Sequence, residues 1–206
     1  MKQNFNLIQS RKKIISLFDE NQTFVAFDTE ATGIDVKNEN IIEIAAVKFN
    51  KNGIIEKFST LVNPQKEISP FISELTGITN QMIQNQPGIQ NALEDFLIFI
   101  ENSVLVAHNA QFDLRIVNEE LNRLERASLK NYAVDTLRFS RILLPENESW
   151  KLSFLAEQFK IKTGTSHRAM EDSLECFELF KILLTLPQPP KKRRGKGKIL
   201  KTTLLT

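Results

Sequence analysis

Five ionisable residues in three short segments carry most of the chemical information in this sequence. They are Asp28 and Glu30 in FDTEATG, Asp113 in AHNAQFD, and His167 and Asp172 in HRAMED. Carboxylate oxygens are the ligands that Mg²⁺ and Mn²⁺ prefer, and a pair of such ions can bracket a phosphodiester. Together the five residues predict a site that binds two divalent metal ions and cleaves phosphodiesters.

The first two carboxylates follow a short apolar run, residues 23–27, which predicts a buried strand. Because side chains alternate along a strand, Asp28 and Glu30 are expected to project from the same face at its end. Two neighbouring carboxylates repel each other unless a cation lies between them. An isolated Asp-x-Glu also arises by chance in a solvated turn, so this pair by itself does not establish a site.

The third carboxylate belongs to a strand-to-helix connection. Residues 103–107 predict another buried strand, and apolar residues at helical spacing predict a helix over 110–124, with Asn109 as its N-cap. Asp113 lies in the first turn, where it faces back toward the strand ends and complements the helix dipole. Dipole compensation alone would also explain it. His108 is interpreted as a hydrogen-bonded strand-end histidine with no role in chemistry.

The last segment combines a loop and a helix. His167 ends the loop, and a helix is predicted over 168–184. Residues five apart do not share a helix face, so His167 is expected to approach from the loop and Asp172 from the helix. An ordinary histidine titrates near neutrality, which suits a general base that takes a proton from water.

These motifs, in this order, resemble the DEDD exonuclease superfamily in its histidine-bearing branch. The resemblance is greatest to the proofreading exonucleases of bacterial DNA polymerase III, the epsilon subunit and the exonuclease domain of PolC. The motifs are DTEATG, HNAQFD and HRAMED, supported by ELTGIT at 74–79 and VDTLRFSR at 134–141, and the likeness spans about residues 23–184.

The resemblance implies a two-metal hydrolysis that releases nucleoside 5′-monophosphates from a 3′ end. All four carboxylates would hold the Mg²⁺ or Mn²⁺ ions, with Asp28 bridging both, and His167 would accept the proton. Binding of the terminal nucleotide is implied for Thr29, Glu30, Leu75, Thr76, Phe112 and His167. Core packing is an equally simple interpretation of Phe112.

The sequence is compatible with three functions. The first is a 3′-to-5′ exonuclease on DNA, either free-standing or as a polymerase subunit, which the ELTGIT segment favours. The second is an exoribonuclease of the same branch, similar to RNase T and oligoribonuclease. The third is a nucleic-acid-binding scaffold without activity, which intact ionisable groups disfavour.

Composition bounds the setting. The 206 residues predict an extension over 1–20, an exonuclease domain over 21–186, and a basic, disordered tail over 187–206. The net charge is +2, but seven of the 27 basic residues and none of the 25 acidic ones lie after residue 186, so the remainder is acidic. The single Cys176 fits a reducing interior. No apolar run could span a membrane, and a cytoplasmic location is expected.

The elements that must position the site predict an α/β fold, a ribonuclease H-like mixed five-stranded sheet flanked by helices. An amphipathic helix is expected over 4–19, and a hairpin turn at 50–53 joins two strands. Strands are predicted near 23–28, 41–49, 53–62, 103–107 and 132–135. Further helices are predicted near 69–75, 79–84, 89–101, 135–143 and 151–159.

Overall fold

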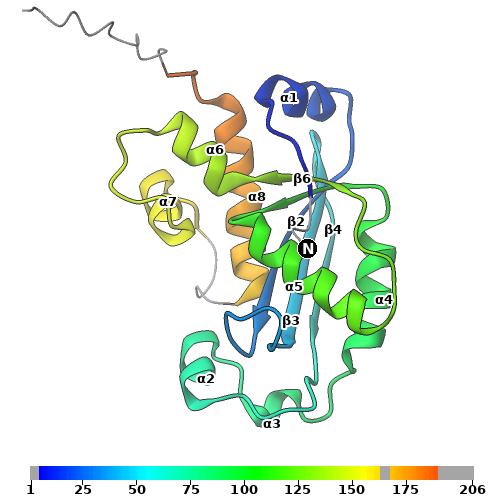
Figure 1. The fold of residues 1–206 in the computed structure, drawn as a ribbon. Helices are drawn as coiled ribbons and strands as arrows, with labels where there is room; N and C mark the ends of the chain where they lie inside the picture. The colour runs from blue at the N-terminus through cyan, green and yellow to red at the C-terminus, as the bar shows by residue number, and fades with distance from the viewer. Residues whose placement is uncertain (1–4, 163–167, 190–206) are drawn as a thin grey trace, which may run out of the picture.

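A central sheet of six strands, in the order β1-β6-β5-β2-β3-β4, organises the chain (Figure 1). The computed structural model describes residues 5–162 and 168–189. The strands are β1 (Asn6–Leu7), β2 (Phe24–Ala31), β3 (Ile41–Asn50), β4 (Gly53–Leu61), β5 (Val104–Ala107) and β6 (Tyr132–Asp135). The helices are α1 (Arg11–Asp19), α2 (Pro70–Thr76), α3 (Asn80–Ile83), α4 (Ile89–Ile100), α5 (Ala110–Arg123), α6 (Thr136–Leu143), α7 (Leu152–Phe159) and α8 (Ala169–Thr185).

The sheet is mixed, as predicted. Strands β2, β3 and β4 are antiparallel neighbours, whereas β5 is parallel to β2 and β6 is parallel to β5. The predicted hairpin turn is present, with Asn50 paired to Gly53, whose φ of 127° suits glycine. The mixed α/β sheet with flanking helices is therefore confirmed, and the expected strand count of five is corrected to six.

The sixth strand comes from the N-terminal segment, where the helix predicted over 4–19 is too long. Asn6 and Leu7 pair in parallel with β6, and α1 starts only at Arg11, after Ser10 accepts a hydrogen bond from the Lys13 backbone N–H. Pairing with the open edge of β6 satisfies backbone groups that a longer helix would leave exposed on that strand. The hydrophobic pattern was that of a helix throughout and could not show this.

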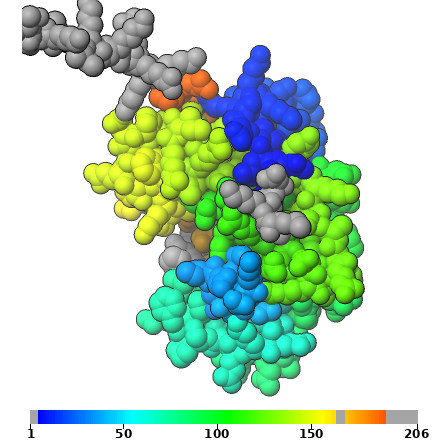
Figure 2. Space-filling view, in the orientation of Figure 1, coloured from blue at the N-terminus to red at the C-terminus, as the bar shows by residue number. Residues whose placement is uncertain are grey.

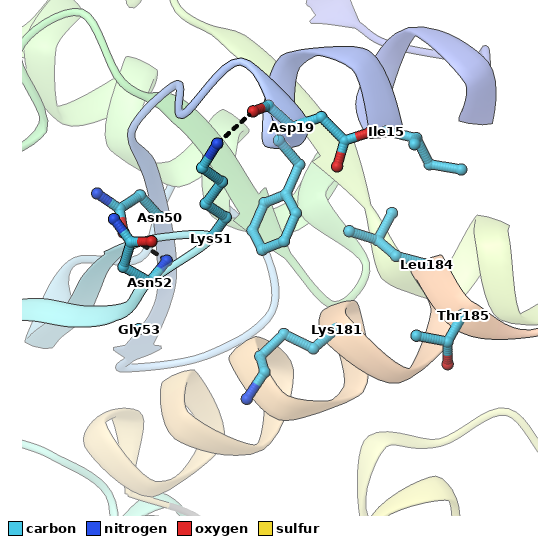
Figure 3. A pocket seen from close by; sticks show the side chains of 10 residues that line it. Ile15, Asp19, Asn50, Lys51, Asn52, Gly53, Lys181, Leu184 and Thr185 are labelled. Atoms are coloured by element: carbon cyan, nitrogen blue, oxygen red, sulfur yellow. Dashed lines mark hydrogen bonds between the residues drawn. The ribbon is translucent and has the colours of Figure 1, made fainter.

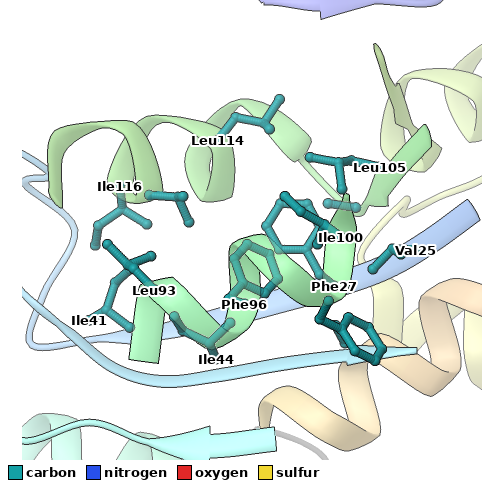
Figure 4. Close-up of a cluster of buried hydrophobic side chains, with 14 of the residues drawn as sticks. Val25, Phe27, Ile41, Ile44, Leu93, Phe96, Ile100, Leu105, Leu114 and Ile116 are labelled. Carbon is teal, nitrogen blue, oxygen red and sulfur yellow. The ribbon is translucent and has the colours of Figure 1, made fainter. Parts of the chain in front are cut away.

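Helices cover both faces of the sheet, and the alternation of side chains along β2 shows which face is which. Phe24 and Ala26 belong to the apolar cluster that includes the buried side of α8, together with residues of α1, α6 and α7. Val25 and Phe27 belong to the cluster formed with α4 and α5, where Phe27 contacts Phe96 (Figure 4). Each further residue of β2 can therefore be assigned to the α8 side or to the α5 side.

Helix α8 runs along one face of the sheet (Figure 1). It begins near the β2–β3 loop and ends near α1. At its C-terminal end, the Arg11 guanidinium donates to the carbonyls of Leu184 and Leu186. The N-terminal segment also lies beside α6, where Arg138 donates to Gln9 at 3.0 Å (Figure 2). Within the described ranges, no helix is long and apolar enough to cross a membrane.

Candidate active site

The first two carboxylates lie at the end of β2, on the side of the sheet that faces α8. The alternation that turns Phe24 and Ala26 toward α8 also turns Asp28 and Glu30 that way, as the sequence predicted. Across the strand pair, Asp28 is opposite Ala45 and Glu30 is opposite Glu43 of β3. The pairing register shifts between Glu30 and Ala31, the last residue of β2, which pairs with Ile41.

Asp172 reaches the same place from the first turn of α8. One carboxylate oxygen from each of Asp28, Glu30 and Asp172 lies within 4.8 Å of the other two. All three side chains are partly buried. Three converging carboxylates provide the hard oxygen ligands that suit a divalent cation, so this arrangement fits the metal ions expected for the site.

The electrostatics of the cluster favour a bound cation. Loss of water raises the pKa of Asp28 well above its usual range, and the nearby charges of Asp113, Glu30 and Asp172 raise it further. Loss of water and the charge of Asp172 raise the pKa of Glu30 to about 8, against a smaller lowering by Arg168. Such mutual repulsion is relieved when a cation neutralises the group.

Asp113 approaches from α5 and is bound to the residue between the first two carboxylates. Thr29 faces the α5 side, and its backbone N–H and hydroxyl donate to Asp113 Oδ1 at 3.1 and 2.8 Å. Burial raises the pKa of Asp113 to about 7, although the Thr29 hydrogen bonds lower it. Asp113 is not one of the three clustered carboxylates, but its charge reaches Asp28.

The backbone around the start of α5 differs from the prediction in one respect. Asn109 occupies the N-cap position, but it has a left-handed backbone (φ 72°) and its side chain makes no capping hydrogen bond. Its N–H instead donates to Asp135 at 3.2 Å. His108 is hydrogen-bonded at both ring nitrogens, to Thr136 Oγ1 at 2.9 Å and to the Trp150 carbonyl at 2.8 Å, so the predicted hydrogen bonding of this histidine is confirmed.

His167 lies outside the described residues, so its role as proton acceptor stays a prediction. The predicted nucleotide contacts divide into two kinds. Thr76 is buried and its hydroxyl donates to the Ile72 carbonyl at 2.9 Å, so that side chain is engaged within its own helix. Leu75 is 47% exposed and Phe112 is half-buried outside the apolar clusters, so both can meet a ligand.

Two residues beside the cluster were missed by sequence reasoning. Glu43 is buried in β3, and its carboxylate binds the Arg168 guanidinium through two hydrogen bonds of 3.1 and 2.7 Å. The sequence does mark Glu43 as a buried acid, since it is the only charged residue in the apolar run IIEIAAV. A buried acid in a core strand requires a partner, and Arg168 next to the motif histidine was a candidate.

The structure also has a groove of about 420 Å³ (Figure 3). It is formed by α1, the β3–β4 turn and the end of α8, and Lys51 in this turn donates to the Asp19 carbonyl at 2.7 Å. The turn begins at Asn50, seven residues along β3 from Glu43, which corresponds to roughly 23 Å of extended strand. The groove is therefore not part of the carboxylate site.

A mixed sheet with clustered carboxylates at the end of its first long strand is the arrangement of a metal-dependent nuclease. Residues 25–180 match the exonuclease family RNase_T, and the chain belongs to this family. It is thus an exonuclease, as the motifs predicted.

Individual relatives agree with this assignment. The DNA polymerase III epsilon subunit of Treponema pallidum is 40% identical over 167 residues, which cover 80% of this chain and 78% of that protein. The epsilon subunit of Aquifex aeolicus is 38% identical over 162 residues, which cover 78% of this chain and 80% of that protein. The PolC-type polymerase of Caldanaerobacter subterraneus is 43% identical over 76% of this chain, which spans only 11% of that protein.

Solved structures agree on the fold. Exonuclease X, determined in complex with 5′-overhanging duplex DNA, matches with a TM-score of 0.63 and 26% identity over 78% of this chain and 90% of that chain. Exonuclease I of Escherichia coli, in complex with a dT13 oligonucleotide, matches with a TM-score of 0.70 and 20% identity, over 80% of this chain and 41% of that chain. The ribonuclease H-like architecture predicted from the sequence is confirmed.

Proposed function

We propose that this exonuclease hydrolyses DNA from its 3′ ends and releases nucleoside 5′-monophosphates, with Mg²⁺ or Mn²⁺ as the metal. The observation that carries the proposal is the convergence of three carboxylates from β2 and α8 within 4.8 Å. The epsilon-subunit relatives, aligned over most of their length, support DNA as the substrate. Single strands or frayed ends are the form that can bring an unpaired 3′ terminus to this site.

The four carboxylates share one task in this proposal, metal binding, and His167 has another. Asp28 and Glu30 on β2 and Asp172 on α8 provide the ligand oxygens, and Asp113 completes the set from α5 while Thr29 holds it by two hydrogen bonds. Bound divalent ions would supply Lewis acidity for the attacking water and would neutralise charge on the leaving 3′ oxygen. His167 is proposed to accept the proton of that water.

The terminal nucleotide is proposed to contact two apolar side chains that the fold leaves at least partly exposed. Leu75 on α2 and Phe112 on α5 offer apolar surface for stacking or packing against an unpaired base. Thr29 and Glu30 are proposed to meet the terminal sugar. Thr76 is assigned a supporting part, because its hydroxyl also accepts the Ile78 N–H at 3.1 Å and so stabilises the end of α2.

The decisive test combines substrate, metal and one variant. Matched single-stranded DNA and RNA oligomers, labelled at the 5′ end, are incubated with Mg²⁺, with Mn²⁺ or with EDTA. We expect metal-dependent shortening of DNA, with 5′-monophosphates as the product. A strong preference for RNA would establish the exoribonuclease instead, and absence of nucleotide release with metal present would establish the inactive scaffold.

The variant Asp28→Asn tests the assigned cluster. It removes one ligand charge while keeping the size of the side chain, and we expect the rate to fall by at least about 100-fold, the scale of losing a charged group at a reaction centre. Asp95→Asn on the exposed side of α4 is the matched control and should retain the full rate. A loss of less than ten-fold for Asp28→Asn would refute the role.

A DNA polymerase is the proposed partner for a proofreading role, because the epsilon and PolC relatives are named as polymerase components. A free-standing repair nuclease has the same chemistry and differs only in this association. The basic tail after residue 189 lies outside the described residues, and its binding of phosphates stays a prediction. Co-purification of a polymerase with the tagged chain, tested with and without the last twenty residues, distinguishes the two roles. The cytoplasmic location also stays a prediction.

A further inference from the structure

The start of α8 is held by a carboxylate from a different part of the chain. Arg168 occupies the N-cap position of α8, but its side chain makes no capping hydrogen bond to the helix. The first N–H of the helix, from Ala169, instead donates to Glu43 Oε2 at 3.1 Å. A helix N-terminus has unpaired N–H groups and a partial positive charge, and the buried carboxylate of Glu43 satisfies both.

The same carboxylate also binds the side chain that precedes the helix. The guanidinium of Arg168 donates to both oxygens of Glu43, from Nε at 3.1 Å and from Nη2 at 2.7 Å. Two parallel hydrogen bonds fix the orientation of both groups, which a single contact would not do. A third link lies one turn along, where the Ser173 hydroxyl donates to the Ala45 carbonyl at 3.0 Å.

This connection lies beside the metal-binding carboxylates. Glu43 is directly opposite Glu30 in the antiparallel register, and like charges in that position destabilise a strand pair unless they are compensated. Arg168 supplies the compensating charge, and it also lowers the pKa of Glu30. Asp172 follows within the first turn, and its N–H donates to the Arg168 carbonyl at 3.1 Å. The backbone that carries Asp172 is therefore attached directly to the Glu43–Arg168 pair.

We propose that Glu43 and Arg168 are positioning residues for metal binding: they fix the first turn of α8 against β3, so that Asp172 meets Asp28 and Glu30. Neither residue is assigned to the reacting atoms. The inference rests on the proposed metal site, and it adds that the affinity of this site depends on a buried ion pair outside the cluster.

The test measures Mn²⁺ binding by isothermal titration calorimetry on the full chain without DNA. Glu43→Gln keeps the shape of the side chain but removes the charge, and we expect the dissociation constant for Mn²⁺ to rise at least ten-fold. Arg168→Lys keeps the charge but cannot make the paired contact, and we expect a rise of about three-fold or more. The second variant decides the question if circular dichroism shows that Glu43→Gln does not fold.

Glu120→Gln is the matched control. Glu120 is as buried as Glu43, binds an arginine (Arg123, 3.1 Å) and accepts a backbone N–H (Ile41, 3.2 Å), but it lies on α5. We expect similar loss of thermal stability and less than a two-fold change in Mn²⁺ affinity. If Glu120→Gln and Glu43→Gln lowered the Mn²⁺ affinity equally, the proposal would be overturned, because a general loss of stability of the fold would explain both.

A second readout separates positioning from chemistry. The concentration of Mg²⁺ that gives half the maximal exonuclease rate should rise at least ten-fold in Glu43→Gln, while the rate at saturating Mg²⁺ stays within three-fold. A folded Glu43→Gln with unchanged metal affinity would refute the inference. Asp172→Asn is titrated in parallel. If both Asp172→Asn and Glu43→Gln bind Mn²⁺ normally, the proposed metal site itself is wrong. If Asp172→Asn binds Mn²⁺ weakly and Glu43→Gln binds it normally, only the positioning role is wrong.

Discussion

The metal-free protein should lose stability as the pH rises, because the fold keeps clustered carboxylates protonated that the unfolded chain is free to ionise. Glu30 is the best case, since its pKa is raised from 4.5 to about 8 in the folded chain. Between these two values the folded protein keeps the proton and the unfolded chain releases it. The unfolded state therefore binds fewer protons, and the free energy of unfolding falls as the pH rises.

The size of the effect follows from the width of this window. Both pH 5 and pH 7 lie inside it, and each pH unit is worth about 1.36 kcal/mol for one group, so Glu30 alone contributes a loss of about 2.7 kcal/mol between them. For a domain of this size, that corresponds to a melting temperature lower by roughly 5–11 °C. The raised pKa values of Asp28 and Asp113 act in the same direction.

Urea unfolding in EDTA at pH 5, 6 and 7, followed by the fluorescence of the single tryptophan, measures the effect. Glu30→Gln should flatten the decline by about 2–3 kcal/mol and should make the metal-free protein more stable than the parent at pH 7. Asp95→Asn, an exposed carboxylate on α4, should leave the decline unchanged. Added Mn²⁺ should restore the parent but not the variant. Parallel pH dependence in Glu30→Gln and the parent, or a parent that gains stability from pH 5 to 7, would refute the reasoning.

Three further predictions concern single side chains. Thr29→Val removes the 2.8 Å hydroxyl hydrogen bond to Asp113, so the pKa of Asp113 should rise and the exonuclease rate at pH 7 should fall by roughly ten-fold or more, with partial recovery toward pH 9 in a pH–rate profile. Arg11→Met leaves the last carbonyls of α8 without their charged donor and should lower the free energy of unfolding by about 1.5–3 kcal/mol, measured by urea titration, with an unchanged rate. Burial raises the pKa of the Cys176 thiol, so iodoacetamide should label it at pH 8 only after unfolding, as mass spectrometry would show.

Local patterns were sufficient for the parts of the fold that depend on local physics. The period-two alternation at the end of β2 predicted that Asp28 and Glu30 share a face, and the turn residues predicted the hairpin at Gly53. The order of the motifs was sufficient to predict the exonuclease family. In each case the information lies within a few consecutive residues or in the order of short motifs.

Contacts between distant segments could not be predicted in the same way. Glu43 and Arg168 are 125 positions apart, and a single sequence does not show which arginine compensates a buried acid. The pairing of Asn6 with β6 depends on an open strand edge that exists only in the assembled sheet. The hydroxyl of Thr76 is used by neighbouring backbone groups that only the helix end brings within reach, and its contact with the substrate stays a prediction.

Helix α8 also provides an attachment point at a known distance from the site for experiments on single molecules. Thr185 ends the helix on the surface, thirteen residues beyond Asp172, which places it about 20 Å along the axis from the carboxylates. Because the natural thiol is buried, a Thr185→Cys variant would carry one reactive handle in the described part of the chain. A dye or surface tether attached there would sit at the opposite end of the sheet, so the nuclease could be immobilised with its cutting edge toward the solution.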